Sequence, residues 1–421
     1  MTSPSELLAD QEHCGRLLPG YAPRQAQLEM ADRVDATLAA GELLVLEAGT
    51  GIGKTLAYLL PILQGGYRAI VSTGTKALQA QIFDKDLPLA RSIAGTDNEV
   101  ALLKGRANYL CLHRLAGADG DRSLTMEMLA DLVRIREWST VTLNGDRMDI
   151  ASVDEDSPIW PFVTSTTDNC LGQRCAFYDD CFVFKARRAA AAASVVVVNH
   201  HLLMAELVLR DDGYGEILPT ADVCIVDEAH QFPDVAAMFL GQHLSSRQLS
   251  ELVRDARLAD SREAGDVPEL DTQLAALERA SREFRLALGD TGRREFAPDA
   301  GATPTQEALA GLGAALEQGA DSLASLRERG PELANAAQRA AQLLARLEAF
   351  SKTDDPDHVR WTEAGRLGFT LHATPVDPGA GFAARRAGLA TSWVFTSATI
   401  AVGGSFAYFR ERLALDDCDE A

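Results

Sequence analysis

A glycine-rich turn contains the residues of this sequence that are best suited to chemistry. It follows the apolar run Leu43–Leu46 and leads into a second apolar run that starts at Leu56. The turn consists of Ala48, Gly49, Thr50, Gly51, Ile52, Gly53, Lys54 and Thr55. Glycines allow backbone N–H groups to surround a phosphate chain, while Lys54 can reach the β- and γ-phosphates and Thr55 can bind Mg²⁺. The pattern predicts a nucleoside triphosphate site between a strand and a helix, although the strict motif has glycine in place of Ala48.

Two adjacent carboxylates follow another apolar strand. Asp227 and Glu228 come directly after Val223–Val226, and His230 lies nearby. At the carboxyl end of a parallel strand, Asp227 would hold Mg²⁺ and Glu228 would orient and activate the attacking water. The tetrapeptide alone could instead be an acidic helix cap. Together with the phosphate loop and Lys54, it predicts a site for nucleotide hydrolysis.

Four of the seven cysteines are candidates for one metal site: Cys111, Cys170, Cys175 and Cys181. Four thiolates suit an iron–sulfur cubane or a zinc ion, and the spacing does not decide between them; unliganded core thiols are the third interpretation. Aromatic residues alternate with basic ones here, the basic ones including Arg187 and Arg188. Because rings stack on unpaired bases and cations follow phosphates, the pattern is typical of single-stranded nucleic acid binding. The rings could instead shield a cluster from water.

Weaker signals accompany the other predicted strands. Gln27 precedes a predicted helix, and its side-chain amide could pair with an adenine edge. Ser397 and Thr399 follow a late apolar strand, where their hydroxyls could link the carboxylate site to a neighbouring element or cap the next helix. His200 and His201 follow a run of four valines. We expect these histidines to form a hydrogen-bonding pair at a strand end rather than a metal site.

The elements that must position these residues are short apolar runs alternating with helical patterns, which is typical of a parallel sheet with crossover helices. We expect one α/β domain that is interrupted twice, first by the cysteine-containing stretch and then by a helical insert rich in Ala, Leu, Arg and Glu. The predicted α/β segments are 1–105, 190–240 and 366–421, and the predicted interruptions are 106–189 and 241–365.

Composition and charge restrict the class of protein. The formal net charge of −21 argues against non-specific coating of DNA but allows a local basic channel. We find no secretory signal and no apolar run long enough to span a membrane, so we expect a cytoplasmic protein with no membrane partner. Seven cysteines in such a protein indicate reduced thiols rather than a disulfide framework.

In this order and spacing, the motifs resemble those of the superfamily 2 DEAH-type helicases, and within them the XPD/DinG-like iron–sulfur helicases. The matching segments are Gln27 for the Q motif, Ala48–Thr55 for motif I, Ser72–Gln81 for motif Ia, Asp227–His230 for motif II and Thr396–Thr399 for motif III. Three further stretches, Leu102–Cys111, Asp168–Gly172 and Val195–His201, are similar to signatures of this group. The resemblance covers almost the whole chain.

The resemblance implies a P-loop RecA-like parallel-sheet domain that carries an iron–sulfur insert and an α-helical Arch-like insert. It implies ATP, Mg²⁺ and a [4Fe–4S] cluster held by the four cysteines. The implied activity is ATP-dependent 5′→3′ translocation on single-stranded and forked DNA with duplex unwinding, in DNA repair. The residues to which it assigns DNA contacts are Thr73, Lys76, Arg187 and Arg188, and those to which it assigns coupling are Ser397 and Thr399. It names no protein partner.

The family has a second RecA-like domain with motifs IV to VI, whose arginine fingers complete the ATP site. The chain ends at Ala421, shortly after motif III, so we expect this polypeptide alone to be inactive as a helicase. Two other functions fit the motifs. One is an ATP-regulated module that binds single-stranded DNA, which an ATP turnover assay with and without DNA would distinguish. The other is a redox sensor, whose DNA affinity would follow the oxidation state of the cluster.

Overall fold

A computed structural model describes residues 2–121, 123–211, 217–297, 303–352 and 355–421. The chain divides into two compact units. The first, here called the sheet unit, comprises Met1–Gly105, Val183–Leu240 and Asp377–Ala421; the second, the insert unit, comprises Arg106–Phe182 and Gly241–Val376. Both stretches that interrupt the α/β pattern therefore contribute to one unit.

The sheet unit is built on a seven-stranded sheet with the order β11-β1-β10-β5-β2-β4-β3. Every neighbouring pair in it is parallel, which confirms the predicted α/β class. The strands are β1 (Leu43–Glu47), β2 (Ala69–Thr73), β3 (Val100–Leu102), β4 (Val195–Asn199), β5 (Ala221–Asp227), β10 (Ala390–Ser397) and β11 (Cys418–Glu420). In a parallel sheet all carboxyl ends lie at one edge, so the ends of β1, β2, β5 and β10 converge.

Apolar residues on both faces of this sheet pack beneath helices, as expected for a parallel sheet. The valines of β4 alternate between the two cores: Val195 and Val197 belong to one, and Val196 and Val198 to the other. The helices are α1 (Pro4–Ala9), α2 (Gln11–Leu17), α3 (Gln25–Ala40), α4 (Lys54–Gly65), α5 (Lys76–Gln81), α6 (Leu87–Ala94), α10 (Phe182–Ala192), α11 (His200–Asp211), α12 (Phe232–Leu240), α17 (Pro378–Arg386) and α18 (Ala407–Leu413). Helix α10 thus begins at the boundary between the units.

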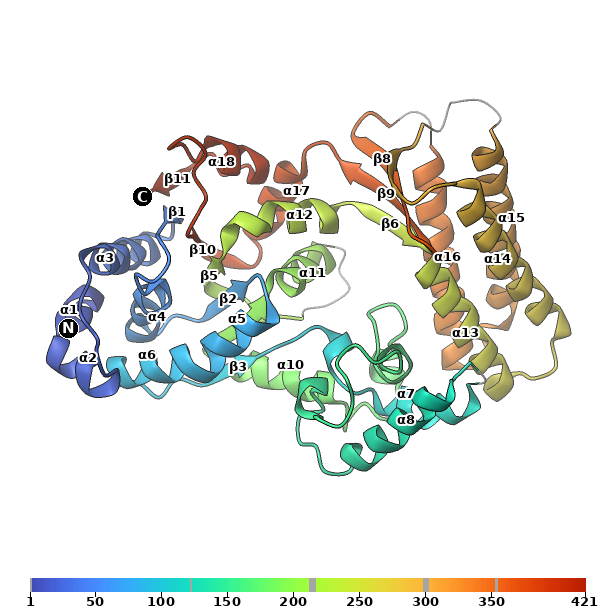
Figure 1. The fold of residues 1–421 in the computed structure, drawn as a ribbon, viewed down its shortest axis with the longest axis horizontal. Helices are drawn as coiled ribbons and strands as arrows, with labels where there is room; N and C mark the ends of the chain where they lie inside the picture. Colours follow the sequence, from blue (N-terminus) through green and yellow to red (C-terminus); the bar gives the residue numbers. More distant parts are fainter. Residues whose placement is uncertain (1, 122, 212–216, 298–302, 353–354) are drawn as a thin grey trace. The chain divides into compact units, whose positions relative to one another are not determined.

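The insert unit combines helices with a four-stranded antiparallel sheet of order β6-β9-β8-β7. Helices α14, α15 and α16 run side by side in it (Figure 1). Its helices are α7 (Leu112–Gly117), α8 (Met126–Ser139), α9 (Trp160–Val163), α13 (Ser246–Glu263), α14 (Pro268–Ala287), α15 (Pro304–Leu326) and α16 (Pro331–Ser351). Its strands are β6 (Gln242–Ser245), β7 (Gly292–Glu295), β8 (His358–Ala364) and β9 (Phe369–Pro375).

The antiparallel sheet is a feature that the sequence interpretation did not include. Along β8 and β9 the buried and partly exposed residues alternate, so each strand presents one apolar face to the helices. Leu371 on β9, for example, belongs to the same core as Leu252 on α13 and Leu343 on α16. Among the described residues, no helix is long and apolar enough to cross a membrane.

Candidate nucleotide site

The glycine-rich turn lies between β1 and α4, where the sequence predicts it. Gly51 and Gly53 have φ angles of 79° and 91°, in the region that favours glycine. Helix α4 begins at Lys54, so the turn leads directly to a helix N-terminus. At Gly53 the geometry has a second cause: a Cβ atom there would lie 2.2 Å from Nε2 of Gln27. The turn therefore requires glycine at position 53 for both conformation and space.

Gln27 supports this turn from inside the protein. Its side chain is buried, Nε2 donates a hydrogen bond to the carbonyl oxygen of Gly53 at 3.0 Å, and Oε1 accepts one from the Tyr21 hydroxyl at 3.1 Å. Both ends of the amide are thus engaged with the protein as the structure places it. The adenine contact expected from the sequence stays a prediction.

The two carboxylates of the DEAH segment (Asp227–His230) face the phosphate loop (Ala48–Thr55). Nζ of Lys54 lies 3.7 Å from Oε1 of Glu228 and has no hydrogen-bond partner among the described residues, although it is buried. Asp227 is also buried; its carboxylate accepts hydrogen bonds from the Tyr58 hydroxyl at 3.1 Å and from the backbone N–H of Glu228 at 2.9 Å. Lys54, Asp227 and Glu228 therefore form one partly buried charge cluster at the carboxyl edge of the sheet, in which Asp227 is the most deeply buried residue.

Burial dominates the electrostatics of this cluster. It raises the pKa of Asp227, while the positive charge of Lys54 acts in the opposite direction. Burial also raises the pKa of Tyr58 well above its usual value, with a further contribution from Asp227, so the phenol remains a hydrogen-bond donor. A carboxylate held in this state gains from any additional cation, because a nearby positive charge favours the ionised form.

The end of β10 reaches the same cluster. The Ser397 hydroxyl lies 2.8 Å from Nδ1 of His230 and donates to Oε2 of Glu228 at 3.4 Å, and His230 Nδ1 lies 3.4 Å from that same oxygen. The backbone N–H of Thr399 donates to the Ser397 hydroxyl at 3.5 Å. The structure thus brings together two residues of the DEAH segment and both hydroxyl residues predicted to couple them to a neighbouring element.

Two supporting residues were missed by sequence reasoning. The carboxylate of Glu47, at the end of β1, accepts hydrogen bonds from the backbone N–H groups of Ile400 and Ala401 at 2.6 and 2.7 Å. These bonds hold the pKa of Glu47 below its usual value and tie the phosphate loop to the segment after Ser397. Tyr58 is the other residue. It lies in an apolar helix run, and nothing in that run distinguishes it from an ordinary core residue.

The residues proposed to contact DNA are in different surroundings. Thr73 is fully buried at the end of β2, whereas Lys76 is partly exposed at the start of α5. On α10, Arg188 is exposed, and the guanidinium of Arg187 lies 5.6 Å from the ring centre of Phe184. The structure therefore gives Lys76 and Arg188 access to solvent and leaves Thr73 enclosed.

All four cysteines predicted to form one site belong to the insert unit. Burial is the main cause that raises the pKa of Cys111 to about 11; Cys170 and Cys181 act in the same direction, and Arg114 acts in the opposite one. The pKa of Cys175 is raised by burial and by the same two neighbours. All four thiols thus interact electrostatically, as four thiol donors for a metal cluster would.

The sulfur of Cys170 has two hydrogen-bond donors around it. Its Sγ accepts hydrogen bonds from the Arg106 guanidinium at 3.2 Å and from the Gly172 backbone N–H at 3.4 Å. Across the described ranges, no three metal-ligating side chains are grouped so that they could hold a metal ion. The donor chemistry fits a thiolate-bound cluster, and the cluster itself stays a proposal.

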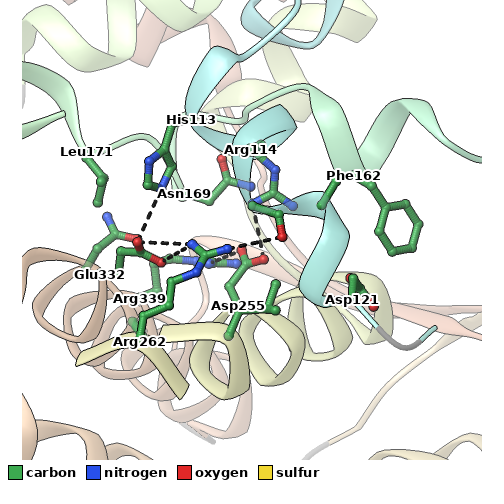
Figure 2. Close-up of a pocket in the computed structure, with 15 residues that line it drawn as sticks. His113, Arg114, Asp121, Phe162, Asn169, Leu171, Asp255, Arg262, Glu332 and Arg339 are labelled. Carbon is green, nitrogen blue, oxygen red and sulfur yellow. Dashed lines mark hydrogen bonds and ion pairs between the residues drawn. The ribbon is translucent and has the colours of Figure 1, made fainter. Parts of the chain in front are cut away.

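Beside the cysteine loops is a small polar cavity of about 50 Å³, shown in Figure 2. Asp255 on α13 accepts hydrogen bonds from Arg114 at 3.1 Å and from Arg339 at 2.7 Å. Arg262 and His113 both approach Glu332, at 2.9 and 3.6 Å. This volume suits one or a few water molecules and is far too small for a nucleotide. The cavity is therefore a structural ion-pair network between the cysteine segment and helices α13 and α16.

Comparison with known proteins agrees with this geometry. The DEAD/DEAH box helicase family matches residues 26–134. The helicase YoaA of Escherichia coli (strain K12) is 43% identical over 96% of this chain and 64% of its own length, and that of Haemophilus influenzae is 39% identical over 96% and 63%. The helicase DinG of Mycobacterium tuberculosis (strain H37Rv) is 34% identical over 64% of this chain and 42% of its own length.

The chain is thus similar in sequence to the YoaA and DinG helicases, and its residues 26–134 match the DEAD/DEAH box helicase family. It spans less than two thirds of the length of these relatives. Among solved structures, one titled "XPD_Helicase" matches 94% of this chain with a TM-score of 0.50 and 14% identity, covering 62% of that chain. At this identity the likeness concerns the fold alone, which is XPD-like. The phosphate loop and the DEAH segment are therefore the motifs that this fold positions at one sheet edge.

Proposed function

We propose that this chain is the nucleotide-binding part of an ATP-dependent DNA helicase that acts in DNA repair. The observation that carries the proposal is the partly buried cluster of Lys54, Asp227 and Glu228 beside a glycine turn. Supporting it, the similar proteins are named ATP-dependent DNA helicases. ATP is the substrate, and single-stranded and forked DNA is the track on which hydrolysis is used.

In this proposal, backbone N–H groups of residues 49–55 bind the phosphates of ATP. The amine of Lys54, now 3.7 Å from Glu228, exchanges that contact for the β- and γ-phosphates. Asp227 and Thr55 would hold Mg²⁺, which supplies neutralisation of charge on the phosphates. Tyr58 fixes the Asp227 carboxylate through the hydrogen bond at 3.1 Å.

Glu228 orients the attacking water and receives its proton. Its carboxylate is placed for this by His230 and Ser397, which lie on the side opposite the amine of Lys54 in the hydrogen-bond network: Lys54 approaches Oε1, and the other two approach Oε2. Ser397 belongs to β10, so a displacement of β10 alters the position of Glu228. Hydrolysis and movement are coupled through this contact, with Thr399 bonded to the same hydroxyl.

The insert unit supplies the second part of the proposal. Cys111, Cys170, Cys175 and Cys181 would hold a [4Fe–4S] cluster, whose role is to order the loops that carry them. The N–H donors on Cys170 stabilise a thiolate at that position. Outside this unit, exposed cations such as Arg188 and Lys76 would follow the phosphates of single-stranded DNA.

Nucleotide binding tests the first part of the proposal. With a fluorescent ATP analogue and Mg²⁺, we expect Lys54→Ala to weaken binding at least tenfold, because the phosphates lose their principal cation. Lys85→Ala is the matched control, since Lys85 is an exposed lysine on the neighbouring π-helical turn Ile82–Asp86. Equal affinities of the parent and Lys54→Ala would contradict the assignment.

Iron content tests the second part. We expect chain purified without oxygen to contain about four irons, the number in a four-cysteine cubane. Cys170→Ser should remove most of the iron, whereas Cys418→Ser, a partly exposed cysteine of the sheet unit, should retain it. Stoichiometric zinc without iron in the parent would reject the cluster.

A further inference from the structure

A buried histidine lies directly behind the DEAH carboxylates. His200 follows β4 and starts α11, and its side chain is fully buried. Nδ1 of its ring lies 2.8 Å from the hydroxyl of Ser72, which is also fully buried, at the penultimate position of β2. The ring meets Phe232 edge to face, at 5.3 Å between centres. Three elements therefore fix the imidazole in one orientation.

The imidazole is neutral and faces the backbone of the DEAH segment. Burial lowers the pKa of His200 to about 4, while the backbone of Glu228 and, less strongly, of Asp227 acts in the opposite direction by hydrogen bonding. Nε2 has no hydrogen-bond partner among the described residues. A fully buried imidazole with one unpartnered nitrogen is costly, which makes His200 a candidate for a functional role.

Glu228 has a backbone conformation that needs support. Its φ and ψ are 55° and 42°, the left-handed region, and Ala414 is the one other non-glycine residue with a positive φ in the described part of the chain. A residue with a Cβ atom adopts this conformation only at an energetic cost. Such strain persists only where neighbouring groups hold it, and it directs the side chain of Glu228 between Lys54 and Ser397.

A second contact joins the same two segments. A Cβ atom on Gly74, the residue after β2, would lie 2.4 Å from Oε1 of Gln231. The chain at the end of β2 thus packs closely on the turn that follows Glu228. The same strand end continues to Lys76, one of the proposed DNA contacts.

We propose that His200 is a positioning residue that connects the end of β2 to the turn after Glu228, through its contacts with Ser72 and Phe232. Through the hydrogen bond between Ser72 and His200, a displacement of β2 on DNA binding changes the conformation of Glu228 and hence its ability to orient water. The function of this link rests on the proposed helicase function. The packing of Ser72, His200 and Phe232 does not, because it exists in the chain without ligands.

Hydrogen exchange in the ligand-free chain tests the physical link. We expect His200→Phe, which keeps the ring and loses both nitrogens, to increase exchange of residues 227–231 by about five- to tenfold. His200→Asn should restore most of the protection, because its amide can still bond to Ser72. His201→Phe is the matched control, because His201 is the exposed neighbour of His200. Hydrogen exchange of residues 227–231 in this variant should equal that in the parent.

The effects of Ser72→Ala and His200→Phe should not add, because both remove the same bond. Exchange of 227–231 in His200→Phe that equals the parent's would overturn the inference. So would an equal increase throughout the sheet unit, since that would indicate general destabilisation.

Ligand binding tests the functional consequence. We expect an oligo-dT strand to change the affinity of the parent chain for the ATP analogue, and His200→Phe to lose most of that change while keeping its affinity for the analogue alone within about twofold. A parent that binds neither ligand would reject the proposed helicase function, and exchange would still decide the role of His200. If oligo-dT changes the affinity for the ATP analogue equally in the parent and in His200→Phe, the inference about His200 is rejected and the proposed helicase function is not.

Discussion

Each unit contains an aspartate that is largely shielded from solvent, Asp227 in the sheet unit and Asp255 in the insert unit. The pKa values of the two carboxyl groups are shifted in opposite directions. Asp227 in the sheet unit has one cation nearby, Lys54, and burial raises its pKa. For Asp255 in the insert unit, burial acts in the same direction, but Arg114, Arg339 and Arg254 outweigh it and hold the pKa below its usual value. The Asp227 carboxylate has too little positive charge nearby to offset its burial, whereas the Asp255 carboxylate has more than enough.

This difference separates a carboxylate that binds a ligand from one that supports the fold. A ligand carboxylate for Mg²⁺ must retain capacity for a cation, so incomplete neutralisation of Asp227 is what its proposed role requires. The negative charge of Asp255 is neutralised by arginines from α7, α13 and α16. These ion pairs occupy the carboxylate, so it is not available to a metal ion. A strongly shifted pKa therefore becomes informative when its direction is considered together with its cause.

We expect the largest loss of stability when Asp255 is replaced. Replacing it by Asn leaves buried guanidinium groups without their counter-charge, and we expect the insert unit to lose about 3–5 kcal/mol of stability. Asp271→Asn is a matched control, because Asp271 also pairs with an arginine but is largely exposed; its loss should cost below about 1 kcal/mol. Hydrogen exchange by segment in denaturant measures both. Equal effects of the two variants would remove the contrast between the units.

Asp227 should behave in the opposite way. Its folded pKa is raised above the unfolded value, so the ionised form opposes folding at neutral pH, and acidification relieves this cost. Asp227→Asn should therefore leave the ligand-free sheet unit as stable as the parent or more stable, since the amide oxygen can still accept from Tyr58. Unfolding by denaturant at pH 7 measures this. A loss comparable to that expected for Asp255→Asn would mean that Asp227 is structural.

A smaller effect sharpens the account of the sheet unit. The folded pKa of Glu47 is lowered, so its contribution to stability is complete above the unfolded pKa of about 4.3 and disappears as the pH falls through the folded pKa. Glu47→Gln retains one carbonyl acceptor and should be less stable than the parent at pH 7. The difference should shrink below about pH 4. Thermal unfolding across that range checks the sign, and a difference that grows on acidification would contradict it.

The sheet unit could be predicted from its sequence to a greater depth than the insert unit, for a physical reason. Parallel strands place their carboxyl ends at one edge, so short motifs after Leu46, Val226 and Phe395 must converge, and they do. Sequence cannot show which side chains complete that site from the core. The supporting roles of Tyr58 and Glu47 depend on hydrogen bonds to Asp227 and to the backbone of Ile400, which lie more than a hundred positions away in the sequence.

In the insert unit, few positions are fixed by local patterns. The leucine spacing of α14 and α16 indicates helices, and the structure has helices there. The antiparallel sheet is less visible, because β6 and β9 are separated by the whole helical segment and pair only through the tertiary fold. The arginines around Asp255 come from three separate helices for the same reason, and no sequence motif announces such a network.

The most direct test of the central claim compares Asp227→Asn with Glu228→Gln in nucleotide binding at varied Mg²⁺. If Asp227 holds the metal and Glu228 orients water, Asp227→Asn should lose at least tenfold in Mg²⁺-dependent affinity for a fluorescent ATP analogue. Glu228→Gln should bind within about threefold of the parent, because the position of Glu228 is devoted to the water and not to the metal. Equal losses of Mg²⁺-dependent affinity in the two variants, or no loss in either, would contradict the account.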